Sequence, residues 1–243
     1  MSTTIAFITG ANRGLGLETA RGLGKLGITV VLGVRDQSKG DAAVKELKAQ
    51  DIKAEALVFD ALKPATFQDV YTYLANQHGK LDILVNNAGV ALGPLHGNNA
   101  SMAPPELLRR TFDVNFFSVV ELTQVLLPLI RKSPAGRIVN LASILGSLGV
   151  HQMPDSPLAQ AKELAYNASK TALNAFTVHL ADELKDTPIK VNSAHPGWVK
   201  TEMGGAEAPM EIGEGSKTSV QLATLPADGP TGGFFHLGEP LPW

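Results

Sequence analysis

Residues 5–16 read Ile5-Ala-Phe-Ile-Thr9-Gly10-Ala-Asn-Arg-Gly14-Leu-Gly16, and a helix-patterned run follows as far as Leu26. A buried strand, a glycine turn and a helix in this order are typical of a site that holds a pyrophosphate at a helix N-terminus. The candidate cofactor-binding residues of this turn are Gly10, Asn12, Arg13, Gly14, Leu15 and Gly16. The spacing G-x-x-x-G-x-G differs from the general dinucleotide fingerprint, so a plain strand–helix turn stays open as the alternative.

Short apolar runs alternate with helix-patterned stretches along the rest of the chain. Runs that are apolar throughout are typical of parallel strands covered by helices on both faces. The predicted strands are Thr4–Thr9, Ile28–Val34, Ala54–Phe59, Ile83–Val85, Arg137–Leu141 and Lys190–Ala194, with a last edge strand near Phe234-Phe235-His-Leu. The pattern therefore predicts α/β class: a single domain over residues 1–243, with a doubly wound parallel sheet of about seven strands.

The composition excludes several classes of protein. The 243 residues are 44% hydrophobic, and 21 Lys+Arg against 23 Asp+Glu give a net charge of −2, so nothing favours a nucleic-acid or membrane-surface partner. The chain has no Cys, which excludes disulfides and thiolate metal sites, and no His, Asp or Glu cluster has metal-ligand spacing. No stretch approaches the roughly 20 apolar residues of a membrane span, so we expect a soluble, cytoplasmic protein.

The end of the second predicted strand indicates the type of cofactor. Val34-Arg35-Asp36 lies about 20 residues beyond the glycine turn, where an acid favours NAD and an arginine favours NADP. We favour Arg35 and therefore NADP(H) over NADH, because Val34 stands at the strand end and Arg13 adds a second guanidinium. The alternatives are that either arginine is a solvated surface charge and that Asp36 is a turn residue.

Three further positions indicate a reaction. Tyr166 and Lys170 are four residues apart at the start of a predicted helix, so a phenol and an ammonium share one face. A nearby cation favours the phenolate, which predicts a lowered pKa for Tyr166 and a general-acid role. Ser143 follows a buried strand and can donate to a carbonyl oxygen. The alternatives are a structural tyrosine with a surface lysine and a helix-capping serine.

These motifs, in this order, resemble the short-chain dehydrogenase/reductase family. The resemblance covers Thr9 to Thr201 and includes the glycine turn, Asn86-Asn87-Ala88-Gly89, Ser143, Tyr166-x-x-x-Lys170 and Pro196-Gly197. Asn-Arg-Gly-Leu-Gly, Val-Arg-Asp, Val-Asn-Phe-Phe and Pro-Gly-Trp-Val-Lys-Thr are most similar to the carbonyl reductases of that family. The resemblance implies a Rossmann-like fold and hydride transfer between NADP(H) and a small carbonyl or alcohol substrate.

The resemblance also implies roles for single residues. Tyr166 would protonate the carbonyl oxygen, Ser143 would hold it, and Lys170 would bind the nicotinamide ribose and lower the tyrosine pKa. Asn115 would position a water for proton relay to Lys170, and its alternative is a satisfied structural amide. The remaining implied cofactor contacts are Asp60 beside the adenine (alternatively a turn residue), Asn87, Ala88 and Gly89 along the cleft, with Asn87 also bracing the sheet, and Pro196, Val199 and Thr201 along the nicotinamide.

Three irregular stretches, 91–105, 146–160 and 197–215, follow predicted strands and are candidate pocket walls. Candidate apolar substrate contacts in them are Leu95, Met153, Trp198 and Met203. Near the presumed nicotinamide, His195 is better interpreted as a packed imidazole than as a general base. Trp243 is predicted to cap the last edge strand, and a substrate-facing position is the less favoured reading.

Ser143 and Tyr166 are 23 residues apart, about ten more than in compact members of the family, and monomeric carbonyl reductases often carry a longer insertion there. The sequence therefore leaves open whether the protein is a monomer or a homo-oligomer. Two other functions are weighed against a carbonyl reductase. One is a ketoreductase for carrier-bound acyl thioesters, and the other is a non-catalytic NADP(H)-sensing module.

Overall fold

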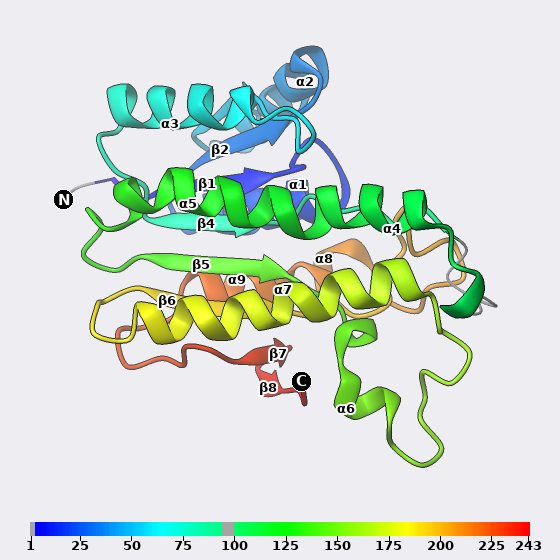
Figure 1. Cartoon of the computed structure of the whole chain (residues 1–243). Helices are drawn as coiled ribbons and strands as arrows, with labels where there is room; N and C mark the ends of the chain where they lie inside the picture. Colours follow the sequence, from blue (N-terminus) through cyan, green and yellow to red (C-terminus); the bar gives the residue numbers. More distant parts are fainter. Residues whose placement is uncertain (1–2, 94–99) are drawn as a thin grey trace.

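A computed structural model describes residues 3–93 and 100–243, and its central feature is one sheet (Figure 1). The strands are β1 (Ile5–Thr9), β2 (Thr29–Val34), β3 (Ala54–Val58), β4 (Ile83–Asn86), β5 (Arg137–Leu141), β6 (Lys190–Ala194), β7 (Phe234–His236) and β8 (Glu239–Pro240). Their order is β3-β2-β1-β4-β5-β6-β7-β8, with every pair parallel except β7–β8. The predicted doubly wound α/β class is confirmed, and the antiparallel β8 is an addition to the prediction.

Helices cover both faces of this sheet. The α-helices are α1 (Gly14–Lys25), α2 (Gln37–Lys48), α3 (Ala65–Gln77), α4 (Pro105–Phe112), α5 (Ser118–Ile130), α6 (Leu148–His151), α7 (Leu164–Glu183), α8 (Ile212–Gly215) and α9 (Lys217–Ala223). Short 3₁₀ turns η1 (Ala100–Met102) and η3 (Ile144–Gly146) and a π-helical turn η2 (Asp113–Phe117) complete the described elements. Helices α1, α2 and α9 pack on one face, and α3, α5 and α7 pack on the other.

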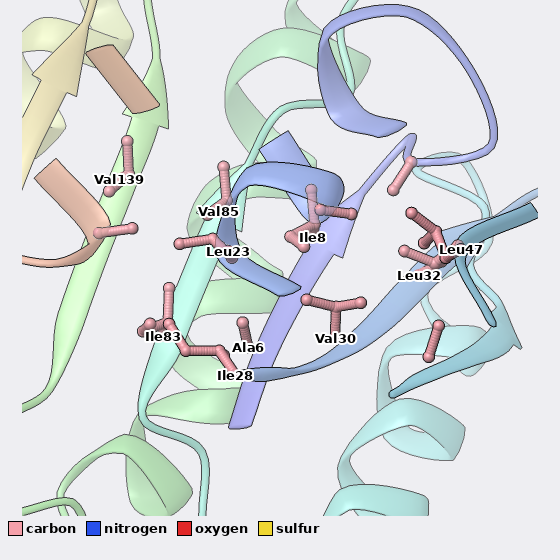
Figure 2. Packing of buried hydrophobic residues seen from close by; sticks show 14 of the residues in the cluster. Ala6, Ile8, Leu23, Ile28, Val30, Leu32, Leu47, Ile83, Val85 and Val139 are labelled. Atoms are coloured by element: carbon pink, nitrogen blue, oxygen red, sulfur yellow. The ribbon is translucent and has the colours of Figure 1, made fainter. Parts of the chain in front are cut away.

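Each central strand sends apolar side chains to two separate cores. In β1, Ile8 packs in the core under α1 and α2, whereas the neighbouring Phe7 packs under α3 and α5. Figure 2 shows the first of these cores, where Leu23 of α1 and Leu47 of α2 lie over the strands. Burial of both alternate sets explains why these strands are apolar at every position. The edge strand β3 is only partly buried, because it has a neighbour on one side only.

One expectation from the sequence is wrong. The continuous helical segment Pro105–Ile130, which joins α4, η2 and α5, is long and apolar enough to cross a membrane by length and composition. The sequence interpretation that no stretch approaches such a span therefore fails. The apolar character has a structural reason, because Leu122, Leu126 and Leu129 are fully or almost fully buried in the core beneath α5. A helix that lies along the middle of a sheet needs an extended apolar face.

The strand order places a crevice at the carboxyl ends of the central strands β1 and β4. From β1 the chain continues outward to β2 and β3, and it then crosses back to β4 on the other side of β1. The register pairs Ile8 with Val85, so the carboxyl ends of β1 and β4 lie side by side. A ligand crevice opens at such a reversal of strand order, because the two connections leave in opposite directions.

Candidate active site

The glycine turn leaves β1 through a backbone that favours glycine. Gly10 has a φ of +66°, and its N–H donates a 2.8 Å hydrogen bond to the carbonyl of Gly33 on β2. Gly16 lies in the first turn of α1, where an added Cβ would stand 2.5 Å from the Gly10 carbonyl oxygen and 2.6 Å from the Asn87 amide nitrogen. The glycine at position 16 therefore lets the helix start directly against the β1 and β4 ends.

The segment after β4 is tied to the end of β1. The Thr9 hydroxyl oxygen accepts hydrogen bonds from the backbone N–H groups of Asn87 (3.0 Å) and Ala88 (2.9 Å). The Asn87 side-chain amide donates to the carbonyls of Thr9 (2.8 Å) and Gly10 (3.3 Å). These four bonds hold Asn87, Ala88 and the glycine turn as one unit at the edge of the sheet.

Asn115 occupies the π-helical turn η2 and is fully buried. Its amide oxygen accepts from the Val90 N–H (2.8 Å), and its amide nitrogen donates to the Val90 carbonyl (2.8 Å) and to the Ser169 hydroxyl (3.0 Å). The side chain thus links the segment after β4 to α7. A Cβ on Gly89 would lie 3.3 Å from the Asn115 oxygen and 3.4 Å from the Lys170 Nζ. A larger residue at position 89 would therefore crowd both polar groups.

The side chains of Ser143, Tyr166 and Lys170 are all buried and lie together at the end of β5. Helix α7 places Tyr166 and Lys170 one turn apart, with Nζ of Lys170 5.6 Å from the tyrosine ring centre. The ammonium donates a 2.7 Å hydrogen bond to the Leu141 carbonyl, the last residue of β5. Ser143 follows β5, hydrogen-bonds the tyrosine side chain and also accepts from the Leu145 N–H (3.2 Å). The capping role that the sequence left as an alternative is therefore present at Ser143, beside the contact with Tyr166.

The expected direction of the tyrosine pKa is wrong for this structure. Burial raises the pKa of Tyr166 from 10.0 to about 12, and the negative charge of Glu163 adds to the rise, although the hydrogen bond from Ser143 opposes it. The Lys170 side chain does not offset the burial, because its own pKa lies below that of Tyr166, and the amine has lost its charge before the phenol ionises. Burial lowers the pKa of Lys170 to about 8.

Arg35 and Asp36, the residues predicted to determine the type of cofactor, have different roles in the structure. Arg35 follows β2, is exposed and lines the central cavity. Asp36 is engaged elsewhere, because its carboxylate caps α2 by accepting from the N–H groups of Ser38 (2.9 Å) and Lys39 (3.3 Å). Asp60 also lines the cavity, and it accepts from the Leu62 N–H (3.1 Å) as a turn residue does. Arg13 forms an ion pair with Glu202.

A cavity of about 870 Å³ brings most of the predicted site together. All predicted catalytic and cofactor-binding residues line it except three buried ones, Asn115, Ser143 and Val199. Val199 packs behind the wall, where its Cγ2 would lie 2.5 Å from a Cβ on Gly215. Lining residues outside both the predicted site and the predicted pocket walls are Gly33, Phe59, Ala61, Leu62, Val90, Val114, Leu141 and Ala142. Phe59 and Ala142 directly follow a strand, and the rule that ligands bind beyond strand ends points to those two.

The three predicted pocket walls contribute unequally. Residues 91–93 and several residues of 197–215 line the cavity, whereas no residue of 146–160 does. The 146–160 stretch is tied to the chain end instead, with the Gly149 N–H bonded to the Trp243 carbonyl (2.7 Å). Met203 lines the cavity, Met153 and Trp198 are exposed outside it, and Leu95 lies outside the described residues. Trp243 stacks on Phe234 of β7 at 5.7 Å.

His195 is a packed imidazole, as interpreted from the sequence. Burial and the neighbouring His236 lower the pKa of His195 to about 3, so the ring is neutral near pH 7. Its Nδ1 accepts from the N–H groups of Ile144 (3.3 Å) and Gly197 (3.4 Å). The described residues contain no group of three or more His, Asp or Glu side chains able to hold a metal ion.

The fold is a Rossmann-like α/β fold, and a cavity at the carboxyl edge of its sheet holds a buried tyrosine–lysine pair. A family model described as short chain dehydrogenase matches residues 4–212. The chain belongs to the short-chain dehydrogenase family of oxidoreductases, as the motifs predict.

Relatives and solved structures agree with this assignment over the whole chain. Carbonyl reductase (NADPH) 1 of Mus musculus is 31% identical over 280 residues, which covers 100% of this chain and 99% of the relative. The structure of salutaridine reductase from Papaver somniferum has a TM-score of 0.81 at 31% identity, covering 96% of this chain and 99% of that one. Carbonyl reductase Sniffer of D. melanogaster has a TM-score of 0.82 at 28% identity and covers 100% of both chains.

Proposed function

We propose that this enzyme is an NADPH-dependent carbonyl reductase that interconverts a ketone or aldehyde with the corresponding alcohol. The observation on which the proposal rests is that Tyr166 and Lys170 line the same cavity as the glycine turn and Arg35. The same cavity therefore contains a backbone suited to bind phosphate, at the glycine turn, and a proton donor with a neighbouring cation, at Tyr166 and Lys170. The names of the mouse and fly relatives, both carbonyl reductases, support this substrate class.

The residues present fit a bound NADP(H). The start of α1 supplies N–H groups for a pyrophosphate, and the absence of side chains at Gly10 and Gly16 allows close approach. Arg35 and Arg13 would hold the 2′-phosphate, because a guanidinium forms bidentate hydrogen bonds with phosphate oxygens. Asp36, the acid that would instead favour the ribose diol of NAD, is occupied in capping α2. When bound, NADPH supplies the hydride that the reduction requires.

The chain's own side chains then deliver the proton. The Tyr166 hydroxyl donates its proton to the carbonyl oxygen as the carbonyl carbon gains the hydride, and the alcohol leaves a phenolate behind. The Ser143 hydroxyl, which hydrogen-bonds the Tyr166 side chain, holds the carbonyl oxygen of the substrate by a second hydrogen bond. The Lys170 cation is 5.6 Å from the ring centre and stabilises the phenolate. Val90, Leu92 and Met203 give the cavity an apolar lining suited to a small carbonyl compound.

The test is the rate of NADPH oxidation with a panel of small ketones and aldehydes, for the wild type and for Tyr166→Phe. The variant keeps the ring that packs in the site and removes the proton donor, so we expect a loss of at least about a thousandfold in kcat with NADPH affinity retained. Near-normal turnover in Tyr166→Phe would overturn the proposal. Activity on acyl thioesters alone would favour the carrier-bound ketoreductase, and tight binding without turnover would favour the sensing module.

A further inference from the structure

Arg13 and Glu202 join two walls of the cavity. Arg13 is the residue before α1, and Glu202 lies in the flap, which we define as residues 196–211, between β6 and α8. Their side chains form an ion pair while remaining 67% and 74% exposed, and both residues line the cavity. Among the described residues, this ion pair connects flap residues 200–205 to the glycine turn.

The flap has its own internal bonds and does not need Glu202 to keep its shape. Val199 pairs with Met210 across the flap, and the Lys200 N–H donates to the Met210 carbonyl (2.9 Å). The Trp198 indole N–H donates to the Gly204 carbonyl (2.8 Å), and Lys200 forms an ion pair with Glu211. Glu202 can therefore lose its partner without unfolding the flap.

From this arrangement we infer that Glu202 is a specificity-determining residue, because its carboxylate competes with the cofactor's 2′-phosphate for the Arg13 guanidinium. The inference rests on the proposed function, in which Arg13 and Arg35 hold that phosphate. An exposed ion pair is weak, and a phosphate offers a guanidinium stronger, bidentate hydrogen bonds, so the exchange favours the phosphate. NADPH therefore breaks the pair on binding, whereas NADH, which lacks the 2′-phosphate, leaves it intact.

Arg13 is the cavity cation for which a cavity carboxylate and the 2′-phosphate compete. The Asp60 carboxylate has Lys63 at 3.5 Å, and Lys200 has Glu211, so each has a partner outside the cavity lining. Within the described part of the chain, no ion pair involves Arg35, so its guanidinium meets no competing carboxylate. Competition at the phosphate site is thus confined to the Arg13–Glu202 pair.

The experiment measures the dissociation constants of NADPH and NADH by calorimetry for the wild type and for Glu202→Gln. We expect Glu202→Gln to bind NADPH about two- to fivefold more tightly, the range that an exposed ion pair supports, and NADH within about 1.5-fold of the wild type. The gain should shrink at high ionic strength, because salt screens exposed charges. Glu207→Gln is the matched control, since it removes an exposed carboxylate of the flap that does not line the cavity and forms no ion pair in the described chain, and it should leave both constants unchanged.

A second pair of variants separates competition from a general charge effect. In an Arg13→Ala background, Glu202→Gln should no longer tighten NADPH binding, because the guanidinium that Glu202 pairs with is absent. An equal gain in both backgrounds, or weaker NADPH binding in Glu202→Gln, would overturn the inference. The two proposals fail differently. If the wild type does not bind NADPH, the proposed function fails, whereas unchanged NADPH binding in Glu202→Gln defeats only the role of Glu202.

Discussion

The ammonium nitrogen of Lys170 lies 5.6 Å from the centre of the Tyr166 ring, and both side chains are buried. The backbone carbonyl of Leu141 accepts a hydrogen bond from this ammonium at 2.7 Å, and no carboxylate forms an ion pair with it in the described chain. The cation is therefore held by a dipole in a desolvated site, which is costly to the folded state. The arrangement leaves the ammonium close enough to act on a phenolate formed during the reaction.

The burial of this cation predicts a pH dependence of stability. The pKa of Lys170 is about 8 in the folded chain and 10.5 ordinarily, so between these values the unfolded chain binds the proton and the folded chain does not. Stability contributed by this group is therefore present at high pH and is lost as the pH falls through about 8. Relative to Lys170→Met, the free energy of unfolding of the wild type should rise by roughly 2–3 kcal/mol from about pH 8 to pH 10.

Urea unfolding of the unliganded protein at several pH values measures this difference. The series stops near pH 10 because the pKa of Tyr166 is raised to about 12, and that group lowers stability as the pH rises above its ordinary value of 10.0. Lys132→Met, which removes an exposed lysine, is the control and should follow the wild type. Parallel curves for wild type and Lys170→Met would show that the ammonium is not desolvated.

Thr9 is predicted to support both the fold and the cofactor site. Its hydroxyl oxygen accepts two backbone N–H groups, and the residue is 2% exposed. Thr9→Val keeps the shape and leaves both donors without their acceptor, so we expect a loss of about 2 kcal/mol or more in unfolding free energy. NADPH should bind about tenfold more weakly, because Asn87 and Ala88 line the cavity. Thr9→Ser keeps the acceptor and should retain most of the affinity, whereas equal losses in both variants would contradict this role.

Arg35 is predicted to set the preference for NADPH. A charge-assisted hydrogen bond contributes about 1.5–3 kcal/mol, so Arg35→Ala should raise the dissociation constant of NADPH by roughly 10- to 100-fold. The constant for NADH should change by less than about twofold. Lys48→Ala removes an exposed cation at the far end of α2 and controls for net charge. Equal weakening of both cofactors would place Arg35 at a group that NADPH and NADH share.

The elements of this fold are predictable where local pattern and long-range packing agree. In β1, Phe7 and Ile8 point into different cores, and the resulting unbroken apolar run identifies a central parallel strand. The glycine turn is equally predictable from the sequence, because Gly10 needs a left-handed φ and Gly16 has no room for a Cβ. The π-helical turn at Asn115 has no such local signal. It depends on contacts with Val90 and Ser169, which are 25 and 54 residues away.

Electrostatics of the site is the part that spacing alone does not give. The four-residue interval predicts that Tyr166 and Lys170 are neighbours, and the structure agrees. It does not reveal that the Leu141 carbonyl draws Nζ toward β5, or that desolvation outweighs the neighbouring cation. The sign of a pKa shift depends on the sum of burial, hydrogen bonds and surrounding charges, and for Tyr166 the last two come from Ser143, after β5, and from Glu163, before α7.

Glu163 is the surrounding charge that a mutation can isolate. Its carboxylate is 1% exposed and caps α7 by accepting from the N–H groups of Ala165 (3.1 Å) and Tyr166. The same charge raises the pKa of Tyr166, so Glu163→Gln should lower that pKa and shift the pH profile of alcohol oxidation, which needs the phenolate, toward lower pH.

Glu163→Asp separates the charge from the cap. Both variants disturb the cap and should cost about 1 kcal/mol of unfolding free energy, but only Glu163→Gln removes the charge. The pH profile of alcohol oxidation in Glu163→Asp should therefore stay with the wild type while that of Glu163→Gln moves. If the two profiles coincide, Glu163 acts on the reaction only by starting α7 at the right residue, and the high pKa of Tyr166 is due to burial alone.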